Sequence, residues 1–509
     1  MVERKVDLTM QRDRWTYLWL ALAALFFTFS SGRWTLPLAA WLAPVFIIRF
    51  MRTQPLWRGL LLTWAVTYVA ATITWWGLDP QPPVVHLILI AFGAALQLLP
   101  LLADRLLAPQ LPGLVSTLVY PAAYTALDYL YVAANPTPSV NAHAYTLYGN
   151  LALLQLASLT GMWGLTFLAS WFATAVNWAW ERSFAWRETW RGAAIYGGIL
   201  LAVLVYGEAR LAFSQPQPGT VRAAALTSVD LRAKLAEVMA SARENRSLFR
   251  QTSAEHQDRY FRDTVREAQA GARLVLWPEM AIPVAKEDEG ALIARGQAVA
   301  SEQGIYLAML YYTSYAEEGR GENKLVLVDP SGEVVLEHLK FGGAAMEGWQ
   351  PGDGVLRTVE SPYGTLSGVI CADTNFPLPM RQAGRNGTDI LFSPTLEWRA
   401  IDPLSAYIAV FRAIENGVSV LRAADNGLSV AIDPYGRILA AADHFRADER
   451  AIVAQLPTQG VFTVYSVIGD VVPWSCAAGV VLLTVWGVLR KRGAARVQRQ
   501  ADPESPQGA

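Results

Sequence analysis

The amino-acid sequence predicts a membrane protein in two parts: a bundle of about eight apolar helices, and one α/β or layered α+β domain of roughly 260 residues. Hydrophobic residues make up 53% of the 509 residues and charged residues only 17%, whereas soluble domains carry about 25% charged residues. Apolar runs crowd the first 208 positions, while residues 209–470 have mixed charges and alternating strand-like and helical runs. A net charge of −1 gives no basic surface for nucleic acid, so nucleic-acid binding is not expected.

Eight apolar runs are candidate membrane spans, because a helix needs about 20 mostly apolar residues to cross a bilayer. They cover residues 15–32, 35–49, 59–78, 84–103, 114–134, 150–178, 192–208 and 471–489. The second run is short, and the sixth contains Gly161 and Gly164, where we expect a kink or an extension past the lipid. Seven such runs near the N-terminus leave too little polar surface to cover them in a soluble protein.

Lys and Arg are distributed unevenly among the loops between these runs. They gather before the first run, after the second, fourth and sixth, and after the eighth, at Arg4, Lys5, Arg12, Arg14, Arg49, Arg52, Arg58, Arg105, Arg182, Arg187, Arg191, Arg490, Lys491 and Arg492. Of the alternate loops, one has only Arg33, and 77–83 and 135–150 have none. Because cytoplasmic loops carry the excess of basic residues, we expect both termini in the cytoplasm and residues 209–470 outside. Residues 1–208 then hold spans one to seven, 471–490 hold the eighth, and 491–509 form a basic, disordered tail.

The segment 209–470 has the sequence pattern of a globular domain. Short β-branched or apolar runs bounded by turns predict strands at Val221–Leu226, Arg273–Trp277, Tyr306–Tyr311, Lys324–Val328, Thr365–Ile370 and Thr388–Phe392. Helices are expected at Glu237–Ala270, Asp288–Gln303 and Leu404–Asn416. Gly417 stands in the usual stop position after the last helix.

Three chemically active side chains follow predicted strands of this domain. Glu279 comes after Trp277-Pro278, Lys340 after the strand 334–339, and Cys371 after Gly368-Val369-Ile370. The second cysteine, Cys476, lies in an apolar stretch, so we expect Cys371 to be a free thiol. Open α/β sheets build their sites at the carboxyl ends of strands, and these three side chains are therefore candidates for one site.

A glutamate, a lysine and a cysteine are the groups that acyl transfer through a thioester requires. The thiolate attacks a carbonyl, a nearby ammonium lowers the thiol pKa, and the carboxylate moves the thiol proton to the leaving group. The ammonium also stabilises the oxyanion that develops. The spacing alone leaves the ordinary alternatives open, namely a surface carboxylate, a solvated lysine and a cysteine buried in the core.

Longer motifs around these residues resemble a known family. They are Leu276-Trp277-Pro278-Glu279, the run Asn323–Pro330 leading to Lys340, Gly368-Val369-Ile370-Cys371 with Phe376-Pro377, and Arg412-Ala413-Ile414-Glu415-Asn416-Gly417. In these motifs the domain resembles the carbon–nitrogen hydrolase (nitrilase) superfamily. Together with the spans, the chain resembles that superfamily's membrane-bound branch, the apolipoprotein N-acyltransferases. The resemblance implies a nitrilase-like α-β-β-α sandwich on the extracytoplasmic side of a bacterial inner membrane.

The resemblance also implies roles for individual residues. Glu279 becomes the general base, Lys340 the oxyanion stabiliser and Cys371 the nucleophile. Residues expected to contact substrate are Glu347, Trp349, Asp373 and Trp398. For Asp373 the alternative is that its side chain caps the turn after Cys371. The implied enzyme is a monomer without metal or organic cofactor. Its Cys thioester takes an acyl chain from a phospholipid and passes it to the N-terminal amine of a diacylglyceryl-cysteine lipoprotein.

The residues around the site depart from the family pattern in several places. Ala372-Asp373 stands where these acyltransferases carry Tyr-Glu, and the segment Pro394–Trp398 lacks their Asn-Asp-rich character. A membrane-tethered amidase or hydrolase with water as acceptor, or an acyltransferase with another acceptor, therefore stays open. An inactive scaffold also stays open, although the intact triad argues against it. Asp128, inside the fifth span, is costly in lipid and should face a polar cavity or lie near an interface.

Overall fold

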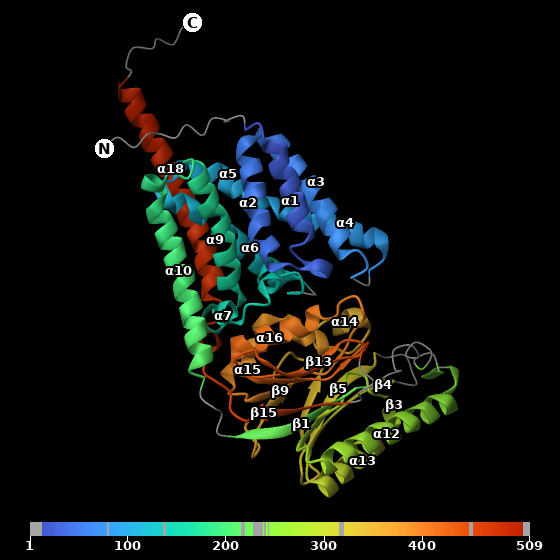
Figure 1. Cartoon of the computed structure of the whole chain (residues 1–509). Helices are drawn as coiled ribbons and strands as arrows, with labels where there is room; N and C mark the ends of the chain where they lie inside the picture. Colours follow the sequence, from blue (N-terminus) through green and yellow to red (C-terminus); the bar gives the residue numbers. More distant parts are fainter. Residues whose placement is uncertain are drawn as a thin grey trace.

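The computed structural model describes residues 13–78, 81–135, 139–214, 219–227, 238, 241–242, 244–314, 320–446 and 451–501. They form a helical bundle on which a two-sheet domain is seated (Figure 1). Arg4, Lys5, Arg12, the beginning of the helix predicted at Glu237–Ala270 and the tail 502–509 lie outside the described residues.

All eight predicted spans are helical for most of their length. The bundle consists of α1 (Thr16–Thr28), α2 (Pro37–Thr53), α3 (Leu56–Trp75), α4 (Pro83–Leu96), α5 (Leu98–Leu107), α6 (Val119–Ala134), α7 (Leu151–Leu154), α8 (Ala157–Thr160), α9 (Met162–Trp180), α10 (Trp186–Ala212) and α18 (Val471–Ala501). Among the described residues, four helices are long and apolar enough to cross a membrane: Leu56–Trp75, Pro83–Gln110, Trp186–Ala212 and Val471–Arg492. The bent pair Leu151–Thr160 and Met162–Trp180 passes the same test as one span and would make a fifth, so the count of eight spans stays a prediction.

The predicted kink in the sixth run is confirmed. The pair Leu151–Thr160 and Met162–Trp180 is bent by 119° at Gly161. Gly161 has a φ of +62°, and a Cβ added there would lie 2.4 Å from the Tyr465 ring. A residue other than glycine is therefore excluded twice, by backbone strain and by the approach of a distant aromatic ring. At the other end of the chain, α18 continues to Ala501, so the tail predicted from residue 491 begins inside a helix.

The globular domain contains two larger sheets. The first has the order β15-β1-β2-β4-β5-β6, with β3 beside β4; its strands are β1 (Thr220–Leu226), β2 (Leu274–Leu276), β3 (Ile282–Ala285), β4 (Tyr306–Ser314), β5 (Glu322–Val328), β6 (Val334–Leu339) and β15 (Ala451–Pro457). The second has the order β14-β13-β11-β9-β8-β7; its strands are β7 (Thr358–Val359), β8 (Leu366–Gly368), β9 (Ile390–Phe392), β11 (Ser419–Arg422), β13 (Leu428–Ile432) and β14 (Ile438–Asp443). A short parallel pair joins β10 (Thr395–Leu396) to β12 (Ala424–Asp425). The predicted strands are thus confirmed, with shifted ends.

The two sheets pack face to face through one apolar core. Leu276 and Leu327 of the first sheet and Ile390 and Leu421 of the second belong to the same buried cluster. The helices α12 (Arg246–Gln269) and α13 (Glu289–Gln303) pack on the first sheet, and α16 (Leu404–Asn416) packs on the second. The domain therefore has four layers in the order helix, sheet, sheet, helix, with α15 (Pro377–Arg385) beside α16 (Figure 1).

The domain is seated on the bundle through α16. One apolar cluster includes Phe411 and Ile414 of α16 together with Trp163 and Leu165 of α9. A tie also runs from the loop after β10, where the Trp398 indole N–H donates to the carbonyl of Leu78 just beyond α3 (2.7 Å). These apolar contacts hold the domain face that carries α16 against the bundle.

Candidate active site

Glu279 lies just beyond the carboxyl end of β2 and is 2% exposed. The preceding Trp277 anchors the turn, since its indole N–H donates to Thr264 (2.9 Å). The Oε1 atom of Glu279 accepts from Asn323 Nδ2 (2.8 Å) and Lys340 Nζ (2.9 Å), and Oε2 accepts from the backbone N–H of Leu396 (2.7 Å). Three donors from three different segments therefore fix this carboxylate in one orientation.

Lys340 follows β6 and is also 2% exposed. Its backbone N–H donates to the carbonyl of Asn323 (3.0 Å), and its carbonyl accepts from Gly352 (2.9 Å), so the chain on both sides is held. Its ammonium contacts two carboxylates, Glu279 at 2.9 Å and Glu347 at 2.6 Å. Glu347 lies on the one-turn helix α14 (Ala344–Glu347) and, unlike Glu279, is partly exposed.

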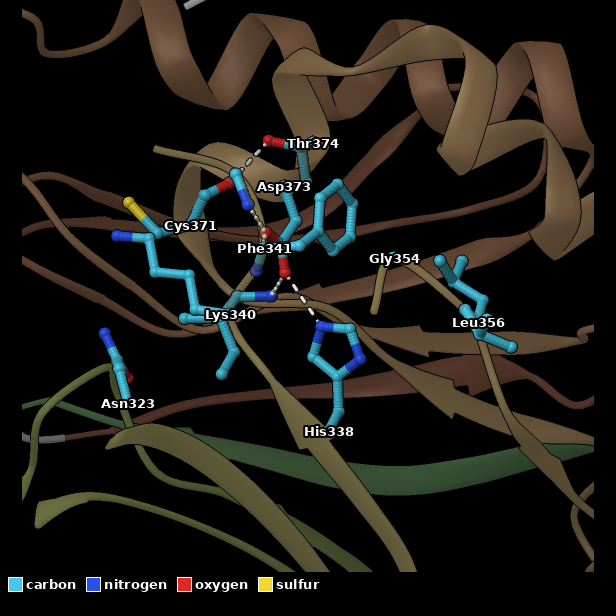
Figure 2. Close-up of polar contacts among 12 residues, drawn as sticks. Asn323, His338, Lys340, Phe341, Gly354, Leu356, Cys371, Asp373 and Thr374 are labelled. Atoms are coloured by element: carbon cyan, nitrogen blue, oxygen red, sulfur yellow. Dashed lines mark hydrogen bonds and ion pairs between the residues drawn. The ribbon is translucent and has the colours of Figure 1, made fainter. Parts of the chain in front are cut away.

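Cys371 follows β8 and opens a 3-10 turn that runs to Asn375. Its backbone N–H donates to the carbonyl of Pro394 (2.8 Å), and its φ of +47° is unusual for a residue with a side chain. The sulfur contacts the carbonyl oxygen of Leu396 at 3.8 Å. Figure 2 shows the sulfur beside the Lys340 ammonium, and the two groups are close enough for their charges to interact. Cys371 and Cys476 are both free thiols, as predicted.

The buried charges set the protonation states of the site. Burial raises the pKa of the Cys371 thiol far above its usual range; the Glu279 carboxylate raises it further, and Lys340 opposes both. Burial lowers the pKa of Lys340, but the negative charges of Glu279 and Glu347 outweigh burial and hold that pKa well above its usual value. At neutral pH the resting site therefore holds an ammonium and a neutral thiol, and the thiol must lose its proton during attack.

This protonation state predicts the pH dependence of thiol alkylation. In a Cys476→Ala background, the rate of Cys371 modification by iodoacetamide should still be rising at pH 9, above the value of about 8.5 where an ordinary cysteine is half ionised. A higher thiol pKa means less thiolate at any given pH, so the curve moves to higher pH. Modification that levels off below pH 8 would contradict the neutral-thiol assignment.

The remaining predicted contact residues are spread around this centre. Glu347 belongs to this centre, because its carboxylate forms an ion pair with Lys340. Trp349 is buried against Tyr312, with ring centroids 5.7 Å apart, and it packs against the α14 turn. Trp398 reaches toward the bundle, where it binds the carbonyl of Leu78. The substrate roles of Trp349 and Trp398 stay predictions.

Asp373 is another predicted substrate contact. It is fully buried, and its two carboxylate oxygens accept four hydrogen bonds from protein groups: Phe341 N, Gly342 N, Ile370 N and His338 Nε2. These four bonds hold the carboxylate among protein donors in the free protein. The substrate-binding role of Asp373 stays a prediction.

Two groups in the site were not predicted from the sequence. Asn323 donates to Glu279, and the backbone of Leu396 contacts both Glu279 and Cys371. Asn323 opens the run Asn323–Pro330 that leads to Lys340, and this place in the motif is the signal that could have found it. Leu396 contributes only backbone atoms, which every residue has. Across the described residues, no group of three or more His, Cys, Asp or Glu is arranged to hold a metal ion.

Comparison with known proteins defines the class of the domain first. Residues 210–461 match the family described as carbon-nitrogen hydrolase. A formamidase from Bacillus cereus is 30% identical over 92 residues, which is 18% of this chain and 28% of that protein. Among solved structures, an amidase from Nesterenkonia sp. is 21% identical and covers 48% of this chain and 93% of its own, with a TM-score of 0.38. The globular part is a carbon–nitrogen hydrolase domain.

Relatives that match over most of the chain narrow the class. The apolipoprotein N-acyltransferase of Geobacter metallireducens is 25% identical over 414 residues, covering 74% of this chain and 75% of that protein. The apolipoprotein N-acyltransferase of Bradyrhizobium diazoefficiens is 28% identical over 394 residues, covering 70% of each chain. The chain belongs to the apolipoprotein N-acyltransferase family.

Proposed function

We propose that this protein transfers an acyl chain from a phospholipid, through a thioester on Cys371, to the N-terminal amine of a diacylglyceryl-cysteine lipoprotein. The observation that carries the proposal is the buried Lys340 ammonium, bonded to Glu279 and Glu347 and beside Cys371. Its setting, in a domain seated on apolar helices, and the names of the full-length relatives support the lipid and lipoprotein substrates.

In the first half-reaction, the Cys371 sulfur attacks the ester carbonyl of the phospholipid as Glu279 accepts the thiol proton. Lys340 faces the oxyanion of the tetrahedral intermediate. Collapse of the intermediate breaks the ester C–O bond, and the proton held by Glu279 passes to the leaving alkoxide, which departs as the lysophospholipid alcohol. The acyl group remains on sulfur.

In the second half-reaction, the free amine of the acceptor attacks the thioester carbonyl. Glu279 takes a proton from the attacking nitrogen and returns it to the departing sulfur, so that an amide forms and the Cys371 thiol is restored. The full cycle begins and ends with a neutral thiol and an ionised Glu279, which agrees with the raised pKa of Cys371.

The proposal includes a membrane orientation, with both termini in the cytoplasm and the catalytic domain outside. Two observations support it. Arg49 and Arg52, near the C-terminal end of α2, form ion pairs with Asp13, which precedes α1, and with Asp104 and Glu181. The chain enters α1 at the end of the bundle away from the domain (Figure 1). At the domain end, the carbonyl of Asn375, four residues after Cys371, accepts from the backbone N–H of Ser139, which follows α6. The nucleophile turn therefore touches the bundle where acyl chains would arrive.

The proposal is tested with the full chain in detergent micelles and phosphatidylethanolamine that carries an isotope-labelled acyl chain. We expect mass spectrometry to find the label on the peptide that contains Cys371. Adding a diacylglyceryl-cysteine peptide should then move the label to its N-terminus. Cys371→Ala should abolish both signals, and Cys476→Ala, a matched loss of the other thiol, should keep them.

The same experiment separates the other functions. Labelled free fatty acid without peptide product would favour a membrane-tethered hydrolase, a class to which the formamidase relative belongs by name. An unlabelled Cys371 in the presence of phospholipid would contradict the proposed donor. Equal activity in Cys371→Ala would show that the nucleophile is assigned wrongly.

A further inference from the structure

Asp373 lies two residues after Cys371 and points into the protein (Figure 2). Its Oδ1 atom accepts from the backbone N–H groups of Phe341 (3.0 Å) and Gly342 (2.6 Å). Its Oδ2 atom accepts from the backbone N–H of Ile370 (2.8 Å) and from His338 Nε2 (2.8 Å). The side chain is 0% exposed, so these four donors are what compensates its loss of water.

The four donors come from two segments that are separate in sequence. His338, Phe341 and Gly342 flank Lys340 on β6 and on the turn that follows it. Ile370 immediately precedes Cys371, on the other sheet. One carboxylate therefore bridges the turn that carries the ammonium and the turn that carries the sulfur.

The two turns approach each other closely at this bridge. A Cβ added to Gly342 would lie 2.6 Å from the backbone nitrogen of Asp373 and 2.7 Å from Ala372. Glycine is thus required at 342, because any side chain there would push the turns apart.

We propose that Asp373 is a positioning residue that sets the separation of the Lys340 ammonium and the Cys371 sulfur, with His338 completing its set of donors. This inference rests on the proposed function for its consequence in acyl transfer. Its geometric content is independent of substrate, because it concerns only two turns of the free protein. Asp373 itself contacts neither the sulfur nor the reacting carbonyl.

The test compares Asp373→Asn with Asp353→Asn, a matched loss of charge at an exposed aspartate that pairs with Arg357. An asparagine at 373 has one acceptor oxygen, and its NH₂ group would face N–H donors. We expect faster hydrogen exchange at the amides of Phe341, Gly342 and Ile370, and a shift of the iodoacetamide profile of Cys371 to higher pH, because Lys340 would lower the thiol pKa less. Acyl-enzyme formation should fall by about tenfold to a hundredfold, the usual effect of a misplaced catalytic group.

A second pair of variants covers the case in which Asp373→Asn does not fold. His338→Gln keeps an N–H donor and should leave the alkylation profile within a few tenths of a pH unit of wild type. His338→Leu removes the donor and should shift the profile to higher pH.

Three results would overturn the inference. One is wild-type exchange at all three amides in Asp373→Asn. Another is an unchanged alkylation profile in both Asp373→Asn and His338→Leu. The third is lost acyl transfer with an unchanged alkylation profile, which would mean that Asp373 acts on a substrate. Alkylation and exchange need no lipid, so a wild-type protein that transfers no acyl group would contradict the proposed function alone.

Discussion

Glu279→Gln is expected to slow acyl-enzyme formation by about 10²- to 10⁴-fold, the range for loss of a general base. Glutamine has the shape of glutamate but cannot take the thiol proton. The same substitution should speed up alkylation of Cys371 by iodoacetamide at neutral pH. The Glu279 charge raises the thiol pKa, so its removal lets Lys340 lower that pKa and increases the thiolate fraction.

The two effects have opposite signs, and that makes the prediction specific. A variant that is merely disordered at the site would lose acylation without a gain in neutral-pH alkylation. Glu333→Gln, at an exposed turn of the same domain, is the matched control and should change neither rate. In the wild-type protein three donors bond to the Glu279 carboxylate, and an amide would bond to them less well. The free energy of unfolding should therefore also fall by about 1–3 kcal/mol. Parallel decreases of both rates would argue against Glu279 as the base.

The three central residues could be predicted because their signals are local. Each stands directly after an apolar run, at the carboxyl end of a strand. Glu279 and Lys340 follow strands of the first sheet and Cys371 follows a strand of the second, and the packing of the two sheets brings them together. The contribution of Asn323 depends instead on strand register. Alternation along β5 directs Asn323 to Glu279 and the next residue, Lys324, to Glu289. A shift of one residue would exchange the two, and the sequence pattern does not decide it.

Asp373 shows why nearness in sequence does not decide which way a side chain points. It stands two residues from Cys371, and the sequence leaves both a substrate contact and a cap of the following turn open. The turn that begins at Cys371, with its positive φ, directs the carboxylate away from the sulfur and toward the turn after Lys340. At Gly161 the nearby glycines predict a kink, but only the structure shows that the ring of Tyr465, from a distant segment, leaves no room for a side chain there.

The attachment of the domain to the bundle depends on buried charge that composition could not show. Arg412 is 1% exposed, pairs with Glu415 (3.0 Å) and donates to the hydroxyl of Tyr145 (2.8 Å). Glu415 in turn accepts from the backbone N–H of Met162 (2.8 Å), the first residue of α9. These contacts join α16 to the bundle. Burial raises the pKa of Glu415 to about 7, although Arg412 opposes that shift.

Arg412→Met is therefore expected to reduce the free energy of unfolding by about 3–5 kcal/mol, because it leaves the Glu415 carboxylate buried without its partner. Unfolding in mixed detergent micelles measures the loss. Arg385→Met, on the exposed end of α15, should stay within about 0.5 kcal/mol of wild type. The double variant Arg412→Met/Glu415→Gln should be more stable than the single one, because the unpaired charge is gone.

The pH dependence of the Arg412→Met variant provides an independent check. Removing Arg412 raises the pKa of Glu415 in the folded state further above its unfolded value of about 4.3. The cost of burying the carboxylate is absent below that unfolded value and grows until the pH passes the folded one. The variant should consequently lose more stability at pH 8 than at pH 6, whereas Arg412→Met/Glu415→Gln should lose this difference. An equal loss at both pH values would show that Arg412 stabilises the contact between α16 and the bundle through Tyr145 and packing, not through the charge of Glu415.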